Sequence, residues 1–249
     1  MFPILQLGPL AIQVPGLVLL VSLWLGLALA EREAKRLNLN ADAIYTLALT
    51  GLIAGVIGAR LAYAARYPGA YLRDPFGLFS LNPSALAQTD GMLIGLVAAY
   101  VYGARRKLPW RPTLDALAPA LAALMIGEAL AHIASGDAFG APARLSWSIF
   151  LWGDYRHPSQ FYELAGSLVV LGLWAWSRDR VPFPGGGFLF VVGLSAVATI
   201  FLEAFRGDSQ ITVLGLRASQ LSGMAMLAAC LFFARRWSQG VVAVEPTSG

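Results

Sequence analysis

Long, almost uninterrupted apolar runs recur along this chain, and they constrain its fold more than any other feature. A transmembrane helix needs about 20 consecutive, mostly apolar residues. Hydrophobic residues make up 57% of the chain and charged residues 13%, whereas soluble domains are roughly a quarter charged. The sequence therefore predicts an all-α polytopic membrane protein, a bundle of about seven transmembrane helices. The apolar runs occupy residues 14–30, 42–64, 86–104, 114–134, 160–176, 186–204 and 214–234.

The positions of the basic residues predict how these helices are oriented. Eleven of the eighteen Lys and Arg residues follow the first, third, fifth or seventh run. Because cytoplasmic loops carry an excess of Lys and Arg, we expect the N-terminus outside and the C-terminus in the cytoplasm. The same alternation excludes a nucleic-acid partner, which would need one basic patch. The first run has no basic residue before Arg32, so a cleaved signal peptide is not expected.

A single membrane domain is the expected organisation. Because no internal repeat or low-complexity tract divides the chain, residues 1–238 are predicted to form one transmembrane domain and residues 239–249 a short cytoplasmic tail. The longest connections, 65–85 and 135–159, fall on the expected outer side, where we expect the function to lie. The single cysteine, Cys230, and the two histidines exclude a disulfide and a Cys- or His-rich metal site. No metal and no cofactor is predicted.

Small residues follow one face of the second apolar run. Such residues let helix backbones approach closely in lipid. We therefore expect a helix-packing face formed by Gly51, Gly55 and Gly58.

Ionisable residues inside apolar runs indicate positions that face protein or water rather than lipid. Glu128 and His132 are four residues apart, so they project from one helix face and could share a hydrogen bond. A structural pair and a histidine base tuned near neutral pH are both consistent with this spacing. Asp90 opens the third run, where a helix N-cap accounts for it simply.

The sixth apolar run carries a polar stripe at four-residue steps, formed by Ser195, Thr199 and Glu203 and followed by Arg206. We expect this stripe to face protein or water. Arg206 could pair with Glu203 or bind a phosphate, because its fork of donors matches phosphate oxygens. Arg60, near the end of the second run, is equally consistent with pairing to an acid and with binding a lipid phosphate.

The most polar segment, "RHPSQFYE" (156–163), directly precedes an apolar run. With this segment the chain resembles the bacterial prolipoprotein diacylglyceryl transferase family, whose pattern is R-H-P-[ST]-Q-L-Y-E. Similar segments extend over most of the chain, namely "GPLAIQVPG" (8–16), "GARLAY" (58–63), "DGMLIG" (90–95), "SGDAFG" (135–140), "LEAFR" (202–206) and "RASQLSG" (217–223).

The resemblance implies a transferase in the bacterial cytoplasmic (inner) membrane that moves a diacylglyceryl group from phosphatidylglycerol to the cysteine thiol of a prolipoprotein lipobox peptide. A thiolate would displace glycerol phosphate from a lipid carbon, which requires guanidinium groups for the phosphate and a base for the thiol. Candidate ligands for the phosphate of this or another anionic lipid are Arg60, Arg156 and Arg206. A supporting polar frame is expected from Asp137, Gly140, His157, Gln160, Glu163 and Glu203.

Several positions that the resemblance links to chemistry carry other residues in this chain. The family's histidine before paired glycines is Asp90 here, and its N-terminal tyrosine is Pro15. Its phosphatidylglycerol-binding arginine and a nearby asparagine become Ala129 and His132, and a tyrosine and an arginine of the sixth run become Ser195 and Thr199.

These replacements leave two candidate bases, His132 and Asp90. With reference pKa values of about 8.5 for Cys, 6.5 for His and 3.9 for Asp, moving the thiol proton costs roughly 2.7 kcal/mol to His and about 6 kcal/mol to Asp. His132 is therefore the better base on chemical grounds. The alternative function is a non-catalytic accessory protein that binds lipid or lipoprotein on the same fold.

Overall fold

The computed structural model describes residues 4–7, 10–79, 86–212 and 215–242, and long α-helices dominate them. Each predicted apolar run overlaps one long helix. Among the described residues, five helical segments are long and apolar enough to cross a membrane: Val14–Arg36, Ala41–Arg66, Trp110–Ser135, Gly186–Phe205 and Ala218–Gln239. The long helices are α1 (Val14–Arg36), α2 (Ala41–Arg66), α4 (Gln88–Arg105), α5 (Trp110–Ser135), α6 (Ser159–Ser177), α7 (Gly186–Leu202) and α8 (Ala218–Val242). The protein is a mostly helical, polytopic membrane protein.

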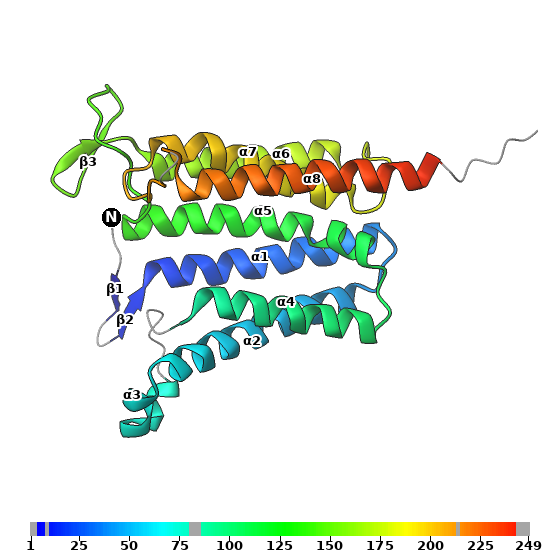
Figure 1. Cartoon of the computed structure of the whole chain (residues 1–249), viewed down its shortest axis with the longest axis horizontal. Coiled ribbons are helices and arrows are strands. Elements are labelled where there is room, and N and C mark those ends of the chain that lie inside the picture. The colour runs from blue at the N-terminus through cyan, green and yellow to red at the C-terminus, as the bar shows by residue number, and fades with distance from the viewer. Residues whose placement is uncertain (1–3, 8–9, 80–85, 213–214, 243–249) are drawn as a thin grey trace, which may run out of the picture. The chain divides into compact units, whose positions relative to one another are not determined.

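The chain divides into two compact units, the first made of Met1–Glu33 with Leu114–Gly249 and the second of Ala34–Thr113. In the first unit α7 packs against both α6 and α8, and the three helices run side by side (Figure 1). A buried cluster joins α5, α6 and α7 through Ala118, Ala122, Val170, Trp174 and Val191. Cys230 of α8 is also buried.

In the second unit α2 and α4 meet where both helices carry glycine. A Cβ atom placed on Gly95 would lie 2.6 Å from the carbonyl oxygen of Gly51, and one on Gly91 would lie 2.7 Å from that of Gly55. Any side chain here would push the helices apart, because protein interiors have no spare volume. Gly58 lies directly under Ile94. The packing face predicted from the sequence is thus confirmed.

The start of α7 is held by a carboxylate from α5. Gly185 adopts a left-handed conformation with φ of 89°, and Asp115 accepts hydrogen bonds from the backbone N–H groups of Gly185 at 2.5 Å and Phe188 at 2.9 Å. The first N–H groups of a helix have no partner within it. Asp115 therefore caps α7 and ties it to α5.

Short elements that were not predicted occupy the loops. The first long loop contains α3 (Pro68–Arg73) and η1 (Pro75–Phe79), while its residues 80–85 lie outside the described part. The second contains an antiparallel hairpin of β3 (Ile149–Leu151) and β4 (Asp154–Arg156). Its two turn residues, Trp152 and Gly153, have φ of 54° and 80°, as a two-residue hairpin turn of this kind requires.

A second antiparallel pair, β1 (Ile4–Leu7) and β2 (Leu10–Gln13), precedes α1. A 3-10 turn, η3 (Glu203–Phe205), continues α7. The protein is therefore mostly helical rather than all-α. The strands contain only a few residues each, and a loop of that length carries no periodic pattern from which a strand could be predicted.

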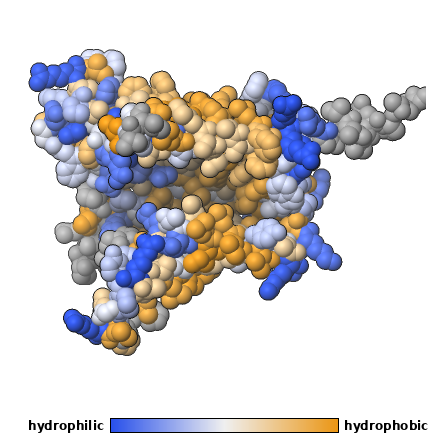
Figure 2. All heavy atoms as spheres, viewed as in Figure 1, coloured by the Kyte–Doolittle hydropathy of each residue, from blue (hydrophilic) through white to orange (hydrophobic). Residues whose placement is uncertain are grey.

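Hydrophobic residues cover the middle of the helices in each unit, and hydrophilic residues gather at the helix ends (Figure 2). Large apolar side chains such as Trp24 of α1, Leu96 of α4 and Phe232 of α8 are more than half exposed. This surface suits lipid rather than water. The domain boundary at 238 stays a prediction: α8 continues to Val242, and residues 243–249 lie outside the described part.

Candidate functional site

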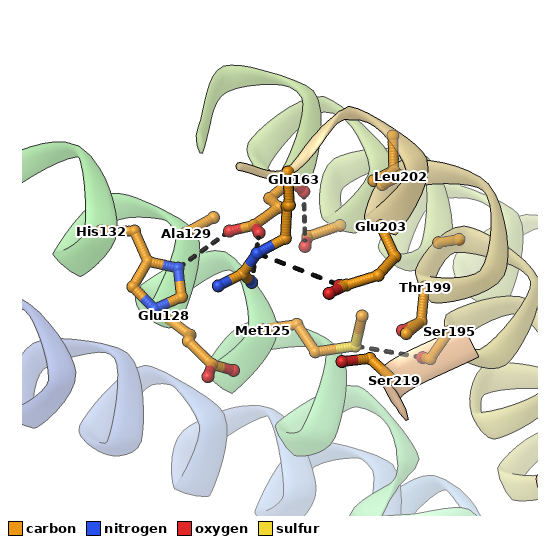
Figure 3. A pocket seen from close by; sticks show the side chains of 13 residues that line it. Met125, Glu128, Ala129, His132, Glu163, Ser195, Thr199, Leu202, Glu203 and Ser219 are labelled. Atoms are coloured by element: carbon orange, nitrogen blue, oxygen red, sulfur yellow. Dashed lines mark hydrogen bonds and ion pairs between the residues drawn. The ribbon is translucent and has the colours of Figure 1, made fainter. Parts of the chain in front are cut away.

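A polar cavity of about 260 Å³ lies in the first unit among α5, α6, α7 and the start of α8 (Figure 3). The predicted polar stripe of Ser195, Thr199 and Glu203 lines it, so the expectation that this stripe faces protein or water is confirmed. The full lining comprises Met125, Glu128, Ala129, His132, Glu163, Ser167, Ser195, Ala198, Thr199, Leu202, Glu203, Arg206 and Ser219. The four replaced positions Ala129, His132, Ser195 and Thr199 are thus brought into one space.

Glu163 of α6 joins the two sides of this cavity. Its Oε2 atom lies 2.8 Å from Nδ1 of His132 on α5, and its Oε1 atom accepts a hydrogen bond of 3.1 Å from Nη1 of Arg206. The side chains of His132, Glu163 and Arg206 are 24%, 19% and 24% exposed, so all three are sheltered but reachable from the cavity. The predicted frame residue Glu163 is therefore part of the cavity wall itself.

Arg206 is surrounded by carboxylates. Its Nε and Nη2 atoms donate to the two carboxylate oxygens of Asp208 at 2.9 and 2.8 Å, and its Nε lies 4.0 Å from Oε2 of Glu203. The hydrogen bond to Asp208 raises the pKa of Arg206 above its ordinary value. Partial burial acts to raise the pKa of Asp208, but the hydrogen bond and the charge of Arg206 lower it below its ordinary value.

Glu203 supports the same group of charges from the end of α7. It is almost fully buried, accepts a hydrogen bond from the hydroxyl of Ser209, and lies close enough to Arg206 for an ion pair. The predicted pairing of Glu203 with Arg206 is confirmed. A phosphate bound by Arg206 would have to compete with Glu163, Asp208 and Glu203 for the guanidinium.

Of the two interpretations that the spacing of Glu128 and His132 left open, the described residues do not show the hydrogen-bonded pair, and Nδ1 of His132 instead contacts Glu163 on α6. Glu128 is exposed and lines the cavity beside His132 (Figure 3). The four-residue spacing does place both side chains on one face of α5, but the carboxylate that contacts His132 comes from α6. Local spacing cannot reveal a partner that is 31 residues away.

Asp90 and Arg60 belong to the second unit and are absent from the residues lining this cavity. Asp90 lies in the first turn of α4 and forms an ion pair of 2.5 Å with Arg66. Its predicted role as an N-cap is wrong, because the capping position is Ala87 and carries no side-chain hydrogen bond. Arg60 is half-buried on α2.

Arg156 supports the loop that carries the hairpin. Its Nε and Nη1 atoms donate to the carbonyl oxygens of Leu151 at 3.0 Å and Gly140 at 3.3 Å, and its guanidinium lies over the ring of Phe139, 4.9 Å from the centroid. Its donors therefore serve the backbone of this loop. Arg156 does not line the polar cavity.

The other predicted frame residues hold the same loop against α6 and η3. Gln160 is fully buried and donates from its amide to the carbonyl oxygen of Asp137 at 2.9 Å. His157 packs edge-on against Phe205, and a Cβ atom on Gly140 would collide with the carbonyl oxygen of His157. Gly140 also forms a bridge to Arg206. The loop thus braces the segment that presents Arg206.

Sequence reasoning missed Asp208, Ser167 and Met125. Asp208 follows Arg206 by two residues in "FRGD", and a turn at the intervening glycine was the available signal. Ser167 lines the cavity and donates to the backbone carbonyl of Glu163 at 2.8 Å. Met125 accepts a hydrogen bond from Ser195 at 3.1 Å, a contact that no pattern in the sequence indicates.

The N-terminal segment 8–16 is described only in part. Gly8 and Pro9 lie outside the described residues, while Pro15 stands in the first turn of α1. Proline is favoured there because the first helical N–H groups need no partner within the helix. Pro15 is thus explained by the helix start alone.

Apolar helices that enclose a charged, partly sheltered cavity define this molecule as a polytopic membrane protein with a polar site among its helices. The model of the family "Prolipoprotein diacylglyceryl transferase" matches residues 3–235. That range includes every residue of the cavity. The chain therefore belongs to the prolipoprotein diacylglyceryl transferase family.

Curated relatives from distant bacteria agree with this assignment. The chain is 31% identical over 230 residues to a protein of Cupriavidus metallidurans, covering 88% of this chain and 84% of the relative. It is 28% identical over 246 residues to one of Synechococcus elongatus, covering 90% and 83%. A relative from Clostridium botulinum is 26% identical over 241 residues, covering 92% and 93%. All three are named phosphatidylglycerol–prolipoprotein diacylglyceryl transferase.

Proposed function

We propose that this protein transfers a diacylglyceryl group from phosphatidylglycerol to the thiol of a prolipoprotein lipobox cysteine and releases glycerol phosphate. The observation that carries the proposal is the family match from residue 3 to residue 235, together with relatives of nearly equal length that bear this activity in their names. The cavity suits the reaction, because it places a histidine and buried charges among apolar helices that lipid can reach.

The base in this proposal is His132. It lines the cavity, and its imidazole is closer in basicity to a thiol than a carboxylate is. Asp90 is the second candidate, but its carboxylate is already engaged by Arg66. Among the predicted phosphate ligands Arg60, Arg156 and Arg206, Arg206 is the one that lines the cavity, where it would act on the charge that develops as glycerol phosphate leaves.

The proposed setting is the inner membrane of a bacterium, with seven spans, the N-terminus outside and the C-terminus in the cytoplasm. The bias of Lys and Arg toward alternate helix ends supports this topology. Single cysteines in a Cys230→Ser background test it. An impermeant maleimide applied to intact cells should label Asp154→Cys in the hairpin and spare Asn38→Cys in the turn after α1. The reverse pattern would contradict the orientation.

The activity itself is tested with purified protein in phosphatidylglycerol liposomes and a synthetic lipobox peptide. Mass spectrometry should detect a peptide heavier by one diacylglyceryl group, attached through a thioether. A peptide in which the cysteine is replaced by serine serves as the matched control and should stay unmodified. No modified peptide in the presence of a folded protein would exclude phosphatidylglycerol as the donor.

A non-catalytic accessory protein is the second candidate function. It is favoured by Ala129, which stands at a position where the family has an arginine, and by the three carboxylates that surround Arg206. A protein of this kind would bind the liposomes or the lipobox peptide without changing the mass of the peptide. The same assay, read out by co-sedimentation as well as by mass, separates the two functions.

A further inference from the structure

We infer that Glu163 is the positioning residue for His132: it holds the imidazole so that Nε2, rather than Nδ1, accepts the proton of the substrate thiol. This inference rests on the proposed function, because the thiol is that of the lipobox cysteine. It gives Glu163 a role beyond the supporting frame expected from its sequence.

The contact with Glu163 determines the tautomer of His132. Glu163 accepts a hydrogen bond from the Arg206 guanidinium at Oε1, and its Oε2 lies 2.8 Å from Nδ1 of His132 (Figure 3). An ionised carboxylate can only accept hydrogen bonds. Nδ1 must therefore carry hydrogen, and in the neutral ring the lone pair is left on Nε2.

Contacts from several elements hold Glu163 and Arg206 in place. Glu163 is fixed by two contacts on opposite sides, one to α5 and one to the segment that follows η3. Arg206 is fixed in turn by its two hydrogen bonds to Asp208. The chain from His132 through Glu163 and Arg206 to Asp208 therefore sets the ring orientation from three separate elements. A base acts efficiently when its own support is held in this way.

The charges around the cavity favour a protonated His132 as the product of proton transfer. Among the described residues in and around the cavity, four carboxylates outnumber two guanidinium groups, those of Arg206 and of Arg217, which donates to the carbonyl oxygen of Arg206. The carboxylates are Glu128 of α5, Glu163 of α6, Glu203 of η3 and Asp208. Proton transfer from a thiol creates an imidazolium beside these carboxylates. Their excess negative charge stabilises that cation more than the neutral ring, so the surroundings favour the charged form that the reaction creates.

The S–H bond of the lipobox cysteine breaks and its proton moves to Nε2 of His132. The thiolate attacks the lipid carbon that carries the phosphate ester, a carbon–sulfur bond forms, and the carbon–oxygen bond breaks with its electron pair on glycerol phosphate. The imidazolium then returns its proton to the leaving phosphate or to water, which regenerates neutral His132.

A Glu163→Gln variant tests this role. An amide cannot enforce one tautomer, because it offers both a donor and an acceptor to Nδ1. The rate of thioether formation at pH 7 should fall by roughly 10²- to 10⁴-fold, the usual contribution of a positioned base. The loss should shrink as the pH rises toward about 9.5, because a free thiol ionises near pH 8.5 without help. A role confined to folding would lower the rate equally at every pH.

A double-mutant comparison tests whether Glu163 acts through His132. Once His132→Gln has removed the base, adding Glu163→Gln should lower the rate little further, because the two residues act as a unit. Asp154→Asn, an acid-to-amide change in the exposed hairpin, is the matched control and should keep the unaltered rate. Detergent-solubilised variants are compared by size-exclusion chromatography and melting temperature before their rates are read.

The outcomes separate the two proposals. No product from the unaltered protein would refute the proposed function. Product from the unaltered protein at a rate that Glu163→Gln leaves unchanged would refute the positioning role alone, and so would a loss that is the same at all pH values. Independent losses from Glu163→Gln and His132→Gln that multiply in the double variant would also overturn it.

Discussion

Arg206 binds Asp208 through two parallel hydrogen bonds, from Nε to Oδ1 at 2.9 Å and from Nη2 to Oδ2 at 2.8 Å. In this bidentate geometry Asp208 binds the edge of the guanidinium formed by Nε and Nη2, and Nη1 donates to Glu163. Arg217 adds a hydrogen bond to the carbonyl oxygen of Arg206. Ion pairs and hydrogen bonds therefore fix the segment after η3. Through Arg206 this segment in turn positions Glu163 and His132.

The first prediction is that the Arg206–Asp208 pair makes the stability of the protein depend on pH. The pKa of Asp208 in the folded protein is lowered. Its stabilising contribution is therefore complete above the ordinary Asp pKa of about 3.9 and is lost as the pH falls through the lower folded value. The melting temperature in detergent should fall more steeply below about pH 4 in the unaltered protein than in Asp208→Asn. Parallel curves for the two proteins would contradict the assignment.

The second prediction concerns the contact between α2 and α4. Gly95→Ala places a Cβ atom 2.6 Å from the carbonyl oxygen of Gly51, so the helices must separate. We expect a loss of roughly 1–3 kcal/mol, the usual cost of overpacking. Gly172→Ala is the matched control, because no atom lies within 4 Å of its added Cβ. That variant should be as stable as the unaltered protein or more so, by roughly 0.5–1 kcal/mol. Thermal unfolding of both variants measures the difference.

The third prediction concerns the cap on α7. Asp115→Ala removes the acceptor for the N–H groups of Gly185 and Phe188, and should destabilise the protein by roughly 0.5–2 kcal/mol. Asp115→Asn keeps one acceptor oxygen and should lose less. Denaturation in detergent at neutral pH measures both. Equal stability of all three proteins would show that the cap does not contribute.

The fourth prediction separates the two candidate bases. His132→Gln should slow transfer by roughly 10²- to 10⁴-fold, because it removes a proton acceptor from the cavity. Asp90→Asn should leave the transfer rate unchanged and remove only the ion pair with Arg66. This ion pair is half exposed and contributes roughly 0.2–1 kcal/mol to the stability of the protein. Rates of thioether formation at saturating phosphatidylglycerol distinguish the two candidate bases. A larger loss from Asp90→Asn than from His132→Gln would make Asp90 the better candidate.

The helices and the packing face were predictable from sequence, because both depend on local composition. An apolar run of about 20 residues predicts a long helix wherever it occurs, and Gly51 and Gly55 indicate a close helix contact by their spacing alone. The polar stripe along α7 and the start of η3 was found in the same way. Its four-residue period places Ser195, Thr199 and Glu203 on one face without any knowledge of the neighbouring helices.

The partners of the charged groups were not predictable, because they come from other helices. The spacing places His132 beside Glu128 on one face of α5, yet the hydrogen bond of His132 goes to Glu163 on α6. Arg156 was a candidate phosphate ligand as long as the carbonyl groups of Leu151 and Gly140 were unknown. The role of an arginine can be assigned only when the acceptors of its guanidinium are known. Backbone carbonyl acceptors cannot be recognised from the sequence.

The most direct test of the central claim follows both products of one reaction. The unaltered protein is placed in liposomes of phosphatidylglycerol with two acyl-chain lengths, together with a lipobox peptide at pH 7. The account predicts two lipidated peptides that differ in mass by the difference between the two diacylglyceryl groups, with one glycerol phosphate released for each. Unmodified peptide, or lipidated peptide without glycerol phosphate, would contradict it.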